Sequence, residues 1–469
     1  MTIAVFFGSK SPEHEVSIIT AQLILSELVK TEHKIVAIYI TKEGKWLVQE
    51  AETKQNSQTS NSASFDQQGE NIQNSTNLQN NSTNNSTNNL QNNKSKRTGL
   101  LALSTFDLEN DNWINKSWQE WQIDTTKSVG KLVLTKKNWI GFSKIEIDLV
   151  FPALHGNCGE DGAISGLCEI FGVPIVGCDL ASSAISMNKI LSKIVAQTAG
   201  VPTAKYLSQN QLEIQNWQQN PNLKEIFVDK IEQEIGYPNF VKPPKLGSSI
   251  GITKARNRSE LLEAFDLCLY YDDQILVEKS IENLADLTCC VLENSGKVET
   301  NLTKPIVNQK NELQFDTLIT SLVQESTYSK ELFSFEDKYL DNDSSIGHNK
   351  PKLIIPAQID TDITQQIQEY SKILFAKIGG SGIARFDFLL DKNTRKLYFS
   401  EINPLPGNLY RHLWAKSDLE FGQVIEILIK TAMEKSKNAK MTNFSSSILK
   451  IANSSKMNGK FGKSGKFVE

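Results

Sequence analysis

The first forty residues alternate between apolar runs and an amphipathic segment. Residues 3–7 are apolar and predict a buried strand, and apolar positions recur at helical spacing through residues 16–30. A second run over residues 34–40 again has strand character. Strand, helix and strand in this order are typical of a βαβ unit, so the predicted fold class is α/β.

Later apolar runs lie next to glycine-rich segments. Residues 147–154 predict a continuous buried strand that leads into His155-Gly-Asn-Cys-Gly-Glu-Asp-Gly162. Residues 236–252 predict a strand, a loop rich in glycine and serine, and a second strand; such a loop can fold over phosphates. Residues 274–281 predict a strand that carries Glu278 near its end, where it could meet the amino group of an adenine.

Two segments lack the pattern of a folded core. Within residues 55–93, 20 of 39 residues are asparagine or glutamine, and few side chains are apolar. Such a stretch buries too little surface to offset its ordering entropy, which predicts a disordered surface insertion over 51–97. Residues 436–469 are rich in serine, asparagine, lysine and glycine without periodicity, which predicts a disordered tail.

Composition narrows the class of protein. The chain has 469 residues, a net charge of −4 and 39% hydrophobic residues, which is typical of a soluble protein with two or three domains. There is no overall basic character for nucleic acid, no apolar stretch of membrane-spanning length, and no signal-peptide pattern. The six cysteines form no Cys-x-x-Cys pair, which favours buried thiols in a reducing cytosol.

Polar side chains with metal-binding chemistry occur on two neighbouring predicted strands. Arg385 and Asp387 are two positions apart on the first strand, and Glu401 and Asn403 are two apart on the second. Residues two apart on a strand point to the same face, so three oxygen ligands can share a cation with Arg385 beside them. Such ligands suit Mg²⁺ that bridges to phosphates, and the cluster predicts phosphoryl transfer.

The ordered set of motifs resembles the D-alanine-D-alanine ligases of the ATP-grasp superfamily. The opening segment 8–17, the loop 155–162 and the segment 385–407 follow the order of that family, over about residues 3 to 430. The resemblance implies an ATP-grasp fold, α+β in its ATP-binding part, with an N-terminal open parallel sheet. The implied regions are an N-terminal substrate domain (1–177), a central ATP-grasp subdomain (178–284), a C-terminal subdomain (285–435) and the tail.

The resemblance also implies a reaction and the residues that perform it. ATP phosphorylates one D-alanine, and the amine of a second D-alanine displaces phosphate from the acyl phosphate. Asp387, Glu401 and Asn403 would hold two Mg²⁺ or Mn²⁺ ions, while Arg385 and the Gly407 backbone N–H would stabilise the oxyanion. The residues implied to bind ATP are Lys189, Lys242, Ser249, Glu278, Lys279, Ile281, Asp286 and Lys338.

Further residues are implied to bind the amino-acid substrates. Lys338 and Tyr339 resemble the family's mobile loop, and the tyrosine would hydrogen bond with Glu15 and Ser248 around the ammonium of the first substrate. A tyrosine here is associated with D-alanine rather than D-lactate as the second substrate. The implied enzyme is a cytoplasmic homodimer in peptidoglycan precursor synthesis, without nucleic-acid partners or membrane insertion. The remaining substrate residues are His155, His412 and Leu413.

The sequence departs from the family pattern mainly around the second substrate. Pro404 stands where the family more often has threonine, and Asn408 where an apolar residue is usual. His412 replaces a serine that often holds the second substrate's carboxylate, and Asp286 replaces a glutamate that meets the ribose. His412 is equally compatible with a packed histidine, and His155 with a core or capping residue.

Two alternative functions remain compatible with these residues. The first is an ATP-grasp ligase with another acceptor, such as D-lactate, D-serine or a further amino acid, which the changes near the second substrate motivate. The second is an inactive nucleotide-binding scaffold that uses residues 55–93 for interactions. The complete set of metal and oxyanion residues argues against the scaffold, because a scaffold has no need of it.

Overall fold

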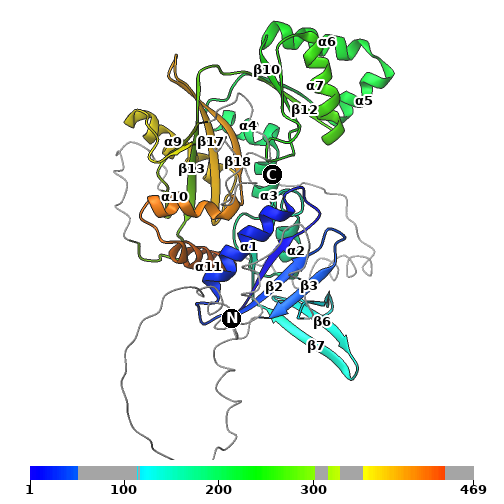
Figure 1. The fold of residues 1–469 in the computed structure, drawn as a ribbon, viewed down its shortest axis with the longest axis vertical. Helices are drawn as coiled ribbons and strands as arrows, with labels where there is room; N and C mark the ends of the chain where they lie inside the picture. The colour runs from blue at the N-terminus through cyan, green and yellow to red at the C-terminus, as the bar shows by residue number, and fades with distance from the viewer. Residues whose placement is uncertain (51–113, 115–116, 301–314, 328–351, 439–469) are drawn as a thin grey trace, which may run out of the picture.

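The computed structural model describes residues 1–50, 114, 117–300, 315–327 and 352–438 of the chain. These residues form an N-terminal, a central and a C-terminal region, each built on its own sheet (Figure 1). The expectations for Lys338, Tyr339, the insertion over 51–97 and the tail beyond 438 lie outside the described residues. Within the described part of the chain, no helix is long and apolar enough to cross a lipid bilayer.

The N-terminal region has a five-stranded sheet of order β4-β3-β2-β1-β8. β1 (Thr2–Gly8) pairs in parallel with β2 (Lys34–Ile40) and with β8 (Leu149–Pro152), so the expected parallel arrangement covers the three strands at the β8 end of the sheet. Helix α1 (His14–Leu28) connects β1 to β2 as a βαβ unit. β3 (Trp46–Glu50) and β4 (Gln119–Glu120) extend the edge in antiparallel pairing.

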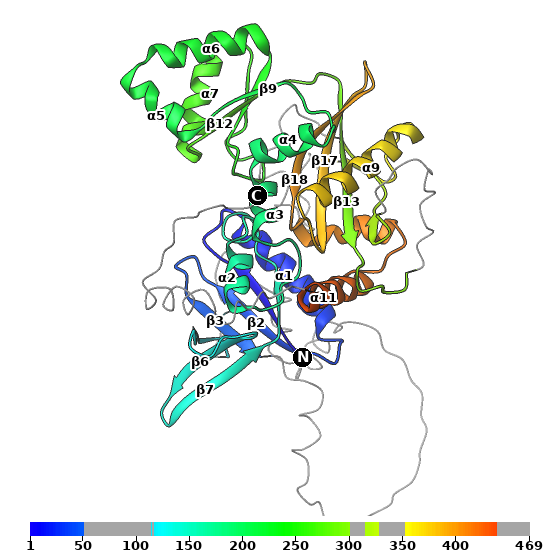
Figure 2. The same cartoon turned by 180° about the vertical axis from the view of Figure 1, so that it is seen from behind.

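A second, three-stranded sheet projects from the N-terminal region (Figure 2). It consists of β5 (Gln122–Ile123), β6 (Leu132–Asn138) and β7 (Gly141–Ile147). The apolar run predicted as one strand over 147–154 is therefore divided, because β7 ends before Asp148 and β8 begins after it. The Asp148 carboxylate accepts a hydrogen bond from the Thr2 N–H at 2.8 Å, which turns the chain between the two sheets.

The central region is a four-stranded antiparallel sheet covered by helices. The order is β11-β10-β12-β9, and Trp217, Phe227 and Phe265 pack together in its core. The loop between β10 and β11 is the predicted segment rich in glycine and serine. The elements are β9 (Tyr206–Gln209), α5 (Gln211–Gln219), α6 (Asn222–Glu234), β10 (Asn239–Lys242), β11 (Thr253–Ala255), α7 (Arg258–Tyr271) and β12 (Ile275–Lys279).

The C-terminal region carries an antiparallel sheet of order β16-β15-β13-β17-β18, with β14 paired to β13. Helix α11 ends at Asn438, so residues 436–438, expected in the disordered tail, are helical. The elements are β13 (Leu284–Glu293), β14 (Leu318–Thr320), β15 (Gln324–Thr327), β16 (Lys352–Ile354), α9 (Thr361–Lys377), β17 (Ile383–Asp391), β18 (Lys396–Asn403), the 3₁₀ turn η3 (Gly407–Tyr410), α10 (Arg411–Lys416) and α11 (Phe421–Asn438).

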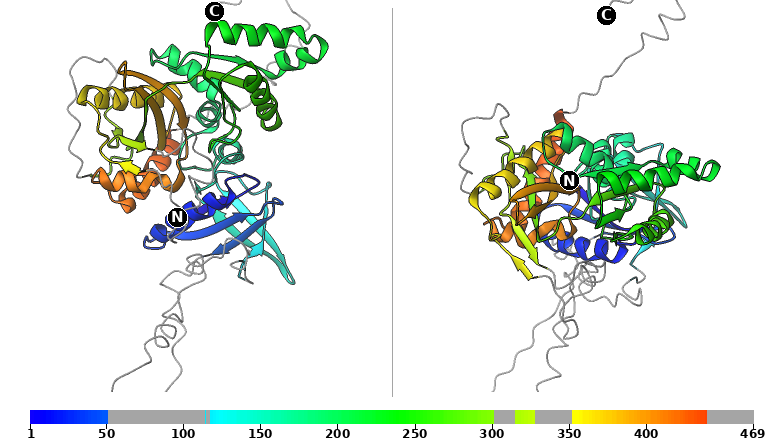
Figure 3. Two further views of the ribbon diagram at one scale, coloured as in Figure 1. Left: turned by 45° about the horizontal axis from the view of Figure 1, so that its top comes forward. Right: turned by 90° about the horizontal axis from the view of Figure 1, so that it is seen from above.

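The N- and C-terminal regions share one hydrophobic core. Ile24 and Leu28 of α1 belong to the same buried cluster as Leu409, Trp414 and Leu428. Three further helices, α2 (Ala163–Phe171), α3 (Leu180–Met187) and α4 (Lys189–Thr198), follow β8, and α3 and α4 pack on β18 (Figure 3). The shared core holds the start of α1 close to the strands that carry the acidic cluster.

Candidate active site

The acidic cluster expected from the sequence forms across two hydrogen-bonded strands. The antiparallel register of β17 and β18 pairs Arg385 with Asn403 and Asp387 with Glu401. Directly opposed residues share a face of the sheet, and so do residues two apart along one strand. All four side chains therefore lie on one face, immediately before a bulge between Asp387 and Phe388.

Arg385 is a fixed positive charge inside this cluster. Its Nε lies 3.0 Å and its Nη2 2.7 Å from Asp387 Oδ2, and Nη2 lies 3.8 Å from a Glu401 oxygen. The guanidinium carbon lies 5.1 Å from the centre of the Tyr410 ring. Burial alone would lower the pKa of Arg385, but the charge of Asp387 and the Tyr410 side chain raise that pKa above its ordinary value.

The chemistry of the donors fits a hard divalent cation. Among the described residues, no three His, Cys, Asp or Glu side chains converge on a common point. A cation at this place would therefore depend on the carboxylates of Asp387 and Glu401 and on the amide oxygen of Asn403. Oxygen donors of this kind suit Mg²⁺ or Mn²⁺ rather than a metal that prefers nitrogen and sulfur ligands.

Lys189 connects the acidic cluster to the loop rich in glycine and serine. It is the first residue of α4, and its ammonium lies 2.9 Å from a Glu401 oxygen. The same ammonium donates to the Leu246 carbonyl, within the loop, at 2.7 Å. Lys189 is thus placed where it can neutralise negative charge between the loop and the acidic cluster.

Glu278 is a buried anion held by two lysines. Its oxygens lie 2.6 Å from the Lys242 ammonium and 2.5 Å from the Lys193 ammonium. Burial alone would raise the pKa of Glu278, but Lys193 and Lys242 lower it to about 2. The carboxylate therefore stays charged, and it fixes Lys242 at the end of β10 beside the loop.

Lys193 belongs to the site although sequence reasoning missed it. Its side chain is 1% exposed, and its ammonium also donates to the Ser400 carbonyl of β18 at 3.0 Å. It thereby joins Glu278 of the central region to the strand that carries Glu401. The signal was present in the sequence, because Lys193 lies four residues after Lys189 and so on the same helix face.

Replacing Lys193 by methionine is expected to lower the free energy of unfolding by about 1–3 kcal/mol. Methionine retains an apolar stem but leaves a Glu278 oxygen and the Ser400 carbonyl without their buried donor. The expected loss stays moderate because Lys242 still pairs with Glu278. Urea unfolding at pH 7 measures it, and equal stability of variant and wild type would contradict the structural role.

The same substitution is expected to change the response to acid. The folded-state pKa of Glu278, about 2, lies below the ordinary value of 4.5, so its stabilising contribution is present above about pH 4.5. That contribution is lost as the pH falls from 4.5 towards 2. The K193M variant retains only one lysine to lower the pKa, so it should lose less stability than wild type as the pH falls below 4.5.

The loop between β10 and β11 meets the start of α1. Ser248 and Ser249 have positive φ values of 53° and 61°, and the Ser248 hydroxyl donates to the Glu13 carboxylate. Gly156 has a positive φ of 66°, which favours glycine, and a Cβ there would lie 2.6 Å from a Glu13 oxygen. Glu13 is thus enclosed between two loops and is only 7% exposed.

The glutamate that contacts Ser248 is Glu13. Tyr339, which was expected to hydrogen bond with Glu15 and Ser248, lies outside the described residues, so the role expected of Glu15 stays a prediction. Glu15 lies in the first turn of α1, and its carboxylate pairs with Lys42 at 2.8 Å on the protein surface. Burial alone would raise the pKa of Glu15, but the hydrogen bond from Lys42 lowers it.

The other residues expected around ATP lie near these elements. Lys279 ends β12 with an exposed side chain, and its backbone N–H donates to the Lys205 carbonyl at 2.9 Å. Ile281 follows it and is partly exposed. Asp286 lies on β13, and its charge contributes to raising the pKa of Lys242, although burial alone would lower that pKa. The roles of these three residues stay predictions.

Two of the three residues expected around the amino acids are hydrogen bonded, and the third is enclosed. His155 is buried and lies 2.8 Å from the Thr20 hydroxyl, while His412 Nε2 lies 2.7 Å from the Gln324 side-chain oxygen. Leu413 is fully buried in the core shared with α1. The Leu413 side chain therefore packs in the core, and the expected role of Leu413 at the substrate stays a prediction.

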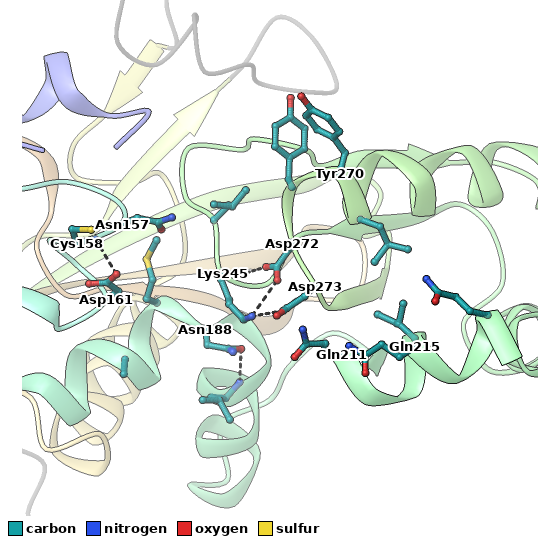
Figure 4. A pocket seen from close by; sticks show the side chains of 18 residues that line it. Asn157, Cys158, Asp161, Asn188, Gln211, Gln215, Lys245, Tyr270, Asp272 and Asp273 are labelled. Atoms are coloured by element: carbon teal, nitrogen blue, oxygen red, sulfur yellow. Dashed lines mark hydrogen bonds and ion pairs between the residues drawn. The ribbon is translucent and has the colours of Figure 1, made fainter. Parts of the chain in front are cut away.

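A separate cleft of about 1050 Å³ lies beside α4, between the N-terminal and central regions (Figure 4). Lys245 pairs there with Asp272 at 3.4 Å and also with Asp273, which fixes the base of the loop before Ser248. Among the site residues expected from the sequence that the structure describes, none lines this cleft. It therefore adjoins the candidate site without containing the acidic cluster.

Comparison with known proteins identifies the family. Residues 2–178 match the model of the D-ala D-ala ligase N-terminus, and residues 195–430 match that of the D-ala D-ala ligase C-terminus. A D-alanine-D-alanine ligase of Caldicellulosiruptor bescii is 32% identical over 95% of this chain and 98% of its own length. The chain belongs to the D-alanine-D-alanine ligase family. A relative from Chloroherpeton thalassium, also 32% identical, covers 94% of this chain and 98% of its own length.

Solved structures of this family have the same fold. A D-Ala:D-Ser ligase from Enterococcus faecalis has a TM-score of 0.63 at 25% identity, over 92% of this chain and 99% of its own. The D-alanine-D-alanine ligase from Coxiella burnetii has a TM-score of 0.62 at 22% identity, over 97% and 98%. The predicted ATP-grasp fold and the predicted family are thereby confirmed.

Proposed function

We propose that this protein is an ATP-dependent ligase that joins two D-alanine molecules and releases ADP and phosphate. The observation that carries the proposal is the cross-strand cluster of Arg385, Asp387, Glu401 and Asn403, with the Lys189 ammonium against Glu401. A carboxylate is a poor electrophile, so peptide-bond formation needs its activation by phosphoryl transfer. The cluster supplies the oxygen donors and the positive charge that this transfer requires.

In the proposed first step, the carboxylate of one D-alanine attacks the terminal phosphorus of ATP, and ADP leaves. Lys189 and Lys242 bind the phosphates as point charges, and the N–H groups around Ser248 and Ser249 cover them. When bound at Asp387, Glu401 and Asn403, two Mg²⁺ or Mn²⁺ ions would neutralise charge on the transferred phosphoryl group. Glu278 keeps Lys242 in position and lies where β12 would border the adenine.

The first D-alanine is proposed to be held through its ammonium group. Glu13 supplies the negative charge, and Ser248 fixes the Glu13 carboxylate and offers its own oxygen. Tyr339 and Lys338 are proposed to close over this substrate and to exclude water, because acyl phosphates hydrolyse readily. The role that the sequence suggested for Glu15 is proposed here for Glu13, because Glu13 is the carboxylate that contacts Ser248.

In the proposed second step, the amine of the other D-alanine attacks the carbonyl carbon of the acyl phosphate. Negative charge then develops on the carbonyl oxygen, where Arg385 and the Gly407 N–H can stabilise it. The carbon–oxygen bond to phosphate breaks, and phosphate leaves with one oxygen of the original carboxylate. The amine loses a proton as the peptide bond forms.

A ligase with another acceptor is the second candidate function. One structural neighbour is a D-Ala:D-Ser ligase, and it is 25% identical over 92% of this chain. At the proposed second-substrate site, His412 is bonded to Gln324 where the family often has a serine. A histidine and glutamine pair can hydrogen bond the hydroxyl of D-serine or D-lactate as well as a carboxylate.

The proposal extends to the setting of the enzyme. We propose that the enzyme acts in peptidoglycan precursor synthesis, in the cytoplasm and as a homodimer. The proposed domain bounds remain 1–177, 178–284 and 285–435. Size-exclusion chromatography with light scattering would report the mass directly, and a monomer at all concentrations would contradict the homodimer.

Product analysis tests the proposed function. The purified chain is incubated with ATP, Mg²⁺ and D-alanine, alone or with D-serine or D-lactate, and products are identified by mass spectrometry with phosphate release measured in parallel. The expected product is D-alanyl-D-alanine, with one phosphate per dipeptide. A mixed product formed at least tenfold faster than D-alanyl-D-alanine would favour the ligase with another acceptor. No turnover with any acceptor would favour the inactive scaffold.

A further inference from the structure

Three consecutive residues after Gly407 have a left-handed backbone. Asn408, Leu409 and Tyr410 have φ values of 53°, 49° and 51°. This conformation is sterically unfavourable for residues with a Cβ, and asparagine tolerates it better than most. Such a run persists only where the surrounding structure fixes it, and strained backbone of this kind is concentrated at functional sites.

Each residue of the turn is anchored by a different part of the molecule. Leu409 is fully buried in the core shared by α1 and α11, and its N–H donates to the Pro406 carbonyl at 2.8 Å. Tyr410 lies over the Arg385 guanidinium. The anchor of Asn408 comes from the N-terminal region, 388 positions away in the sequence.

Thr20 of α1 provides this anchor. The Asn408 backbone N–H donates to the Thr20 hydroxyl oxygen at 3.0 Å, and the Asn408 side-chain oxygen lies 3.3 Å from the same hydroxyl. On its other side, the Thr20 hydroxyl lies 2.8 Å from His155 Nε2, and His155 Nδ1 lies 3.1 Å from a Glu160 oxygen. Thr20 is completely buried, and His155 and Glu160 are nearly so.

The direction of these hydrogen bonds follows from the donors available. We assign the His155 proton to Nδ1, where it can be donated to Glu160, so Nε2 is an acceptor. The Thr20 hydroxyl then donates to His155 Nε2, which at 2.8 Å is closer to it than the Asn408 side-chain oxygen at 3.3 Å. The Thr20 oxygen is then free to accept the Asn408 N–H. A chain from Glu160 through His155 and Thr20 to Asn408 thus crosses from the N-terminal region to the turn beside Gly407.

We propose that Thr20 and Asn408 are positioning residues that hold the left-handed turn, so that the Gly407 N–H points at the reacting carbonyl. The inference rests on the proposed function, because it takes Gly407 as the oxyanion donor. It also explains why asparagine stands at 408 where relatives usually have an apolar residue. Asparagine tolerates positive φ better than an apolar residue does, and its backbone N–H donates to Thr20.

Three variants separate the hydrogen bonds from the backbone conformation. Thr20→Val keeps a branched side chain but removes the hydroxyl, whereas Thr20→Ser keeps the hydroxyl and serves as the matched rescue. Asn408→Gly accepts positive φ and keeps the backbone N–H, but removes the side-chain oxygen. For each variant, kcat, the KM for ATP and the ADP released per dipeptide are measured, together with the melting temperature.

T20V is expected to lower kcat for dipeptide formation by about 10- to 100-fold, because a small displacement of a positioned group has effects of this size. The KM for ATP should change less than about twofold, and more ADP should appear per dipeptide, because the unused acyl phosphate hydrolyses. T20S should restore the wild-type amount of ADP released per dipeptide, and the decrease in kcat should be smaller in N408G than in T20V. An unchanged kcat in T20V, or an equal loss in T20S, would overturn the positioning role.

Hydrogen exchange of the turn gives a readout that does not depend on activity. In T20V, the Asn408 amide should exchange at least tenfold faster than in wild type, whereas amides of α11 should be unchanged. Equal protection in both proteins would overturn the inference. Wild type that makes no dipeptide would instead contradict the proposed function, and the exchange rates would still decide whether Thr20 holds the turn.

Discussion

Replacing Glu401 by glutamine is expected to lower the rate of dipeptide formation by about 10³-fold while the protein stays folded. Glutamine has nearly the same shape, but it removes the negative charge opposite Asp387 and against Lys189. A hard divalent cation binds anionic oxygens much better than neutral ones, and only two carboxylates are available in this cluster. Glu401 is partly exposed, so its neutralisation should cost little stability.

Glu426→Gln is the matched control for this prediction. Glu426 lies on α11 and pairs with Lys430 on the surface, so its charge contributes little to stability and none to the cluster. Both variants are compared with wild type by circular dichroism, melting temperature and steady-state rate at several Mg²⁺ concentrations. If E401Q retains more than a tenth of the wild-type rate, the assignment of Glu401 as a metal ligand fails.

Replacing Glu13 by glutamine is expected to lower kcat/KM for the first D-alanine by about 10²-fold. The Glu13 carboxylate is buried between the loops at Gly156 and Ser248, where its charge can pair with an ammonium group. Glutamine would keep a hydrogen bond to Ser248 but lose the charge. Glu15→Gln should stay within about twofold of wild type, because the ion pair of Glu15 among the described residues is with the surface lysine Lys42.

The pair E13Q and E15Q distinguishes the two glutamates directly. Initial rates are measured over a range of D-alanine concentrations with saturating ATP, and the KM for ATP serves as an internal control. A large loss in E13Q alone supports the arrangement in the structure. A large loss in E15Q with a normal E13Q would restore the assignment made from the sequence.

The sequence predicted those parts of the site that depend on local periodicity. The alternation of side chains along strands placed Arg385 with Asp387, and Glu401 with Asn403, on one face, and the register confirmed that they meet. The α/β class followed from the βαβ pattern at the N-terminus in the same way. Both arguments work because a strand fixes the direction of each side chain without reference to distant segments.

Contacts between distant segments could not be obtained in this way. The choice between Glu13 and Glu15 depends on the exact start of α1 and on a loop 235 residues away. Lys193 seemed an ordinary helical lysine, because its partner Glu278 lies in another region. The burial of Leu413 likewise results from packing between α1 and α11, which no local pattern encodes.

The transfer of oxygen from substrate to phosphate tests the central claim most directly. D-alanine labelled with ¹⁸O in both carboxylate oxygens is incubated with the protein, ATP and Mg²⁺, and the released phosphate is analysed by mass spectrometry. We expect one ¹⁸O atom in each phosphate, together with D-alanyl-D-alanine that carries one ¹⁸O in its peptide carbonyl and two in its C-terminal carboxylate. Unlabelled phosphate would contradict it, because the carboxylate would then not have attacked the terminal phosphorus of ATP.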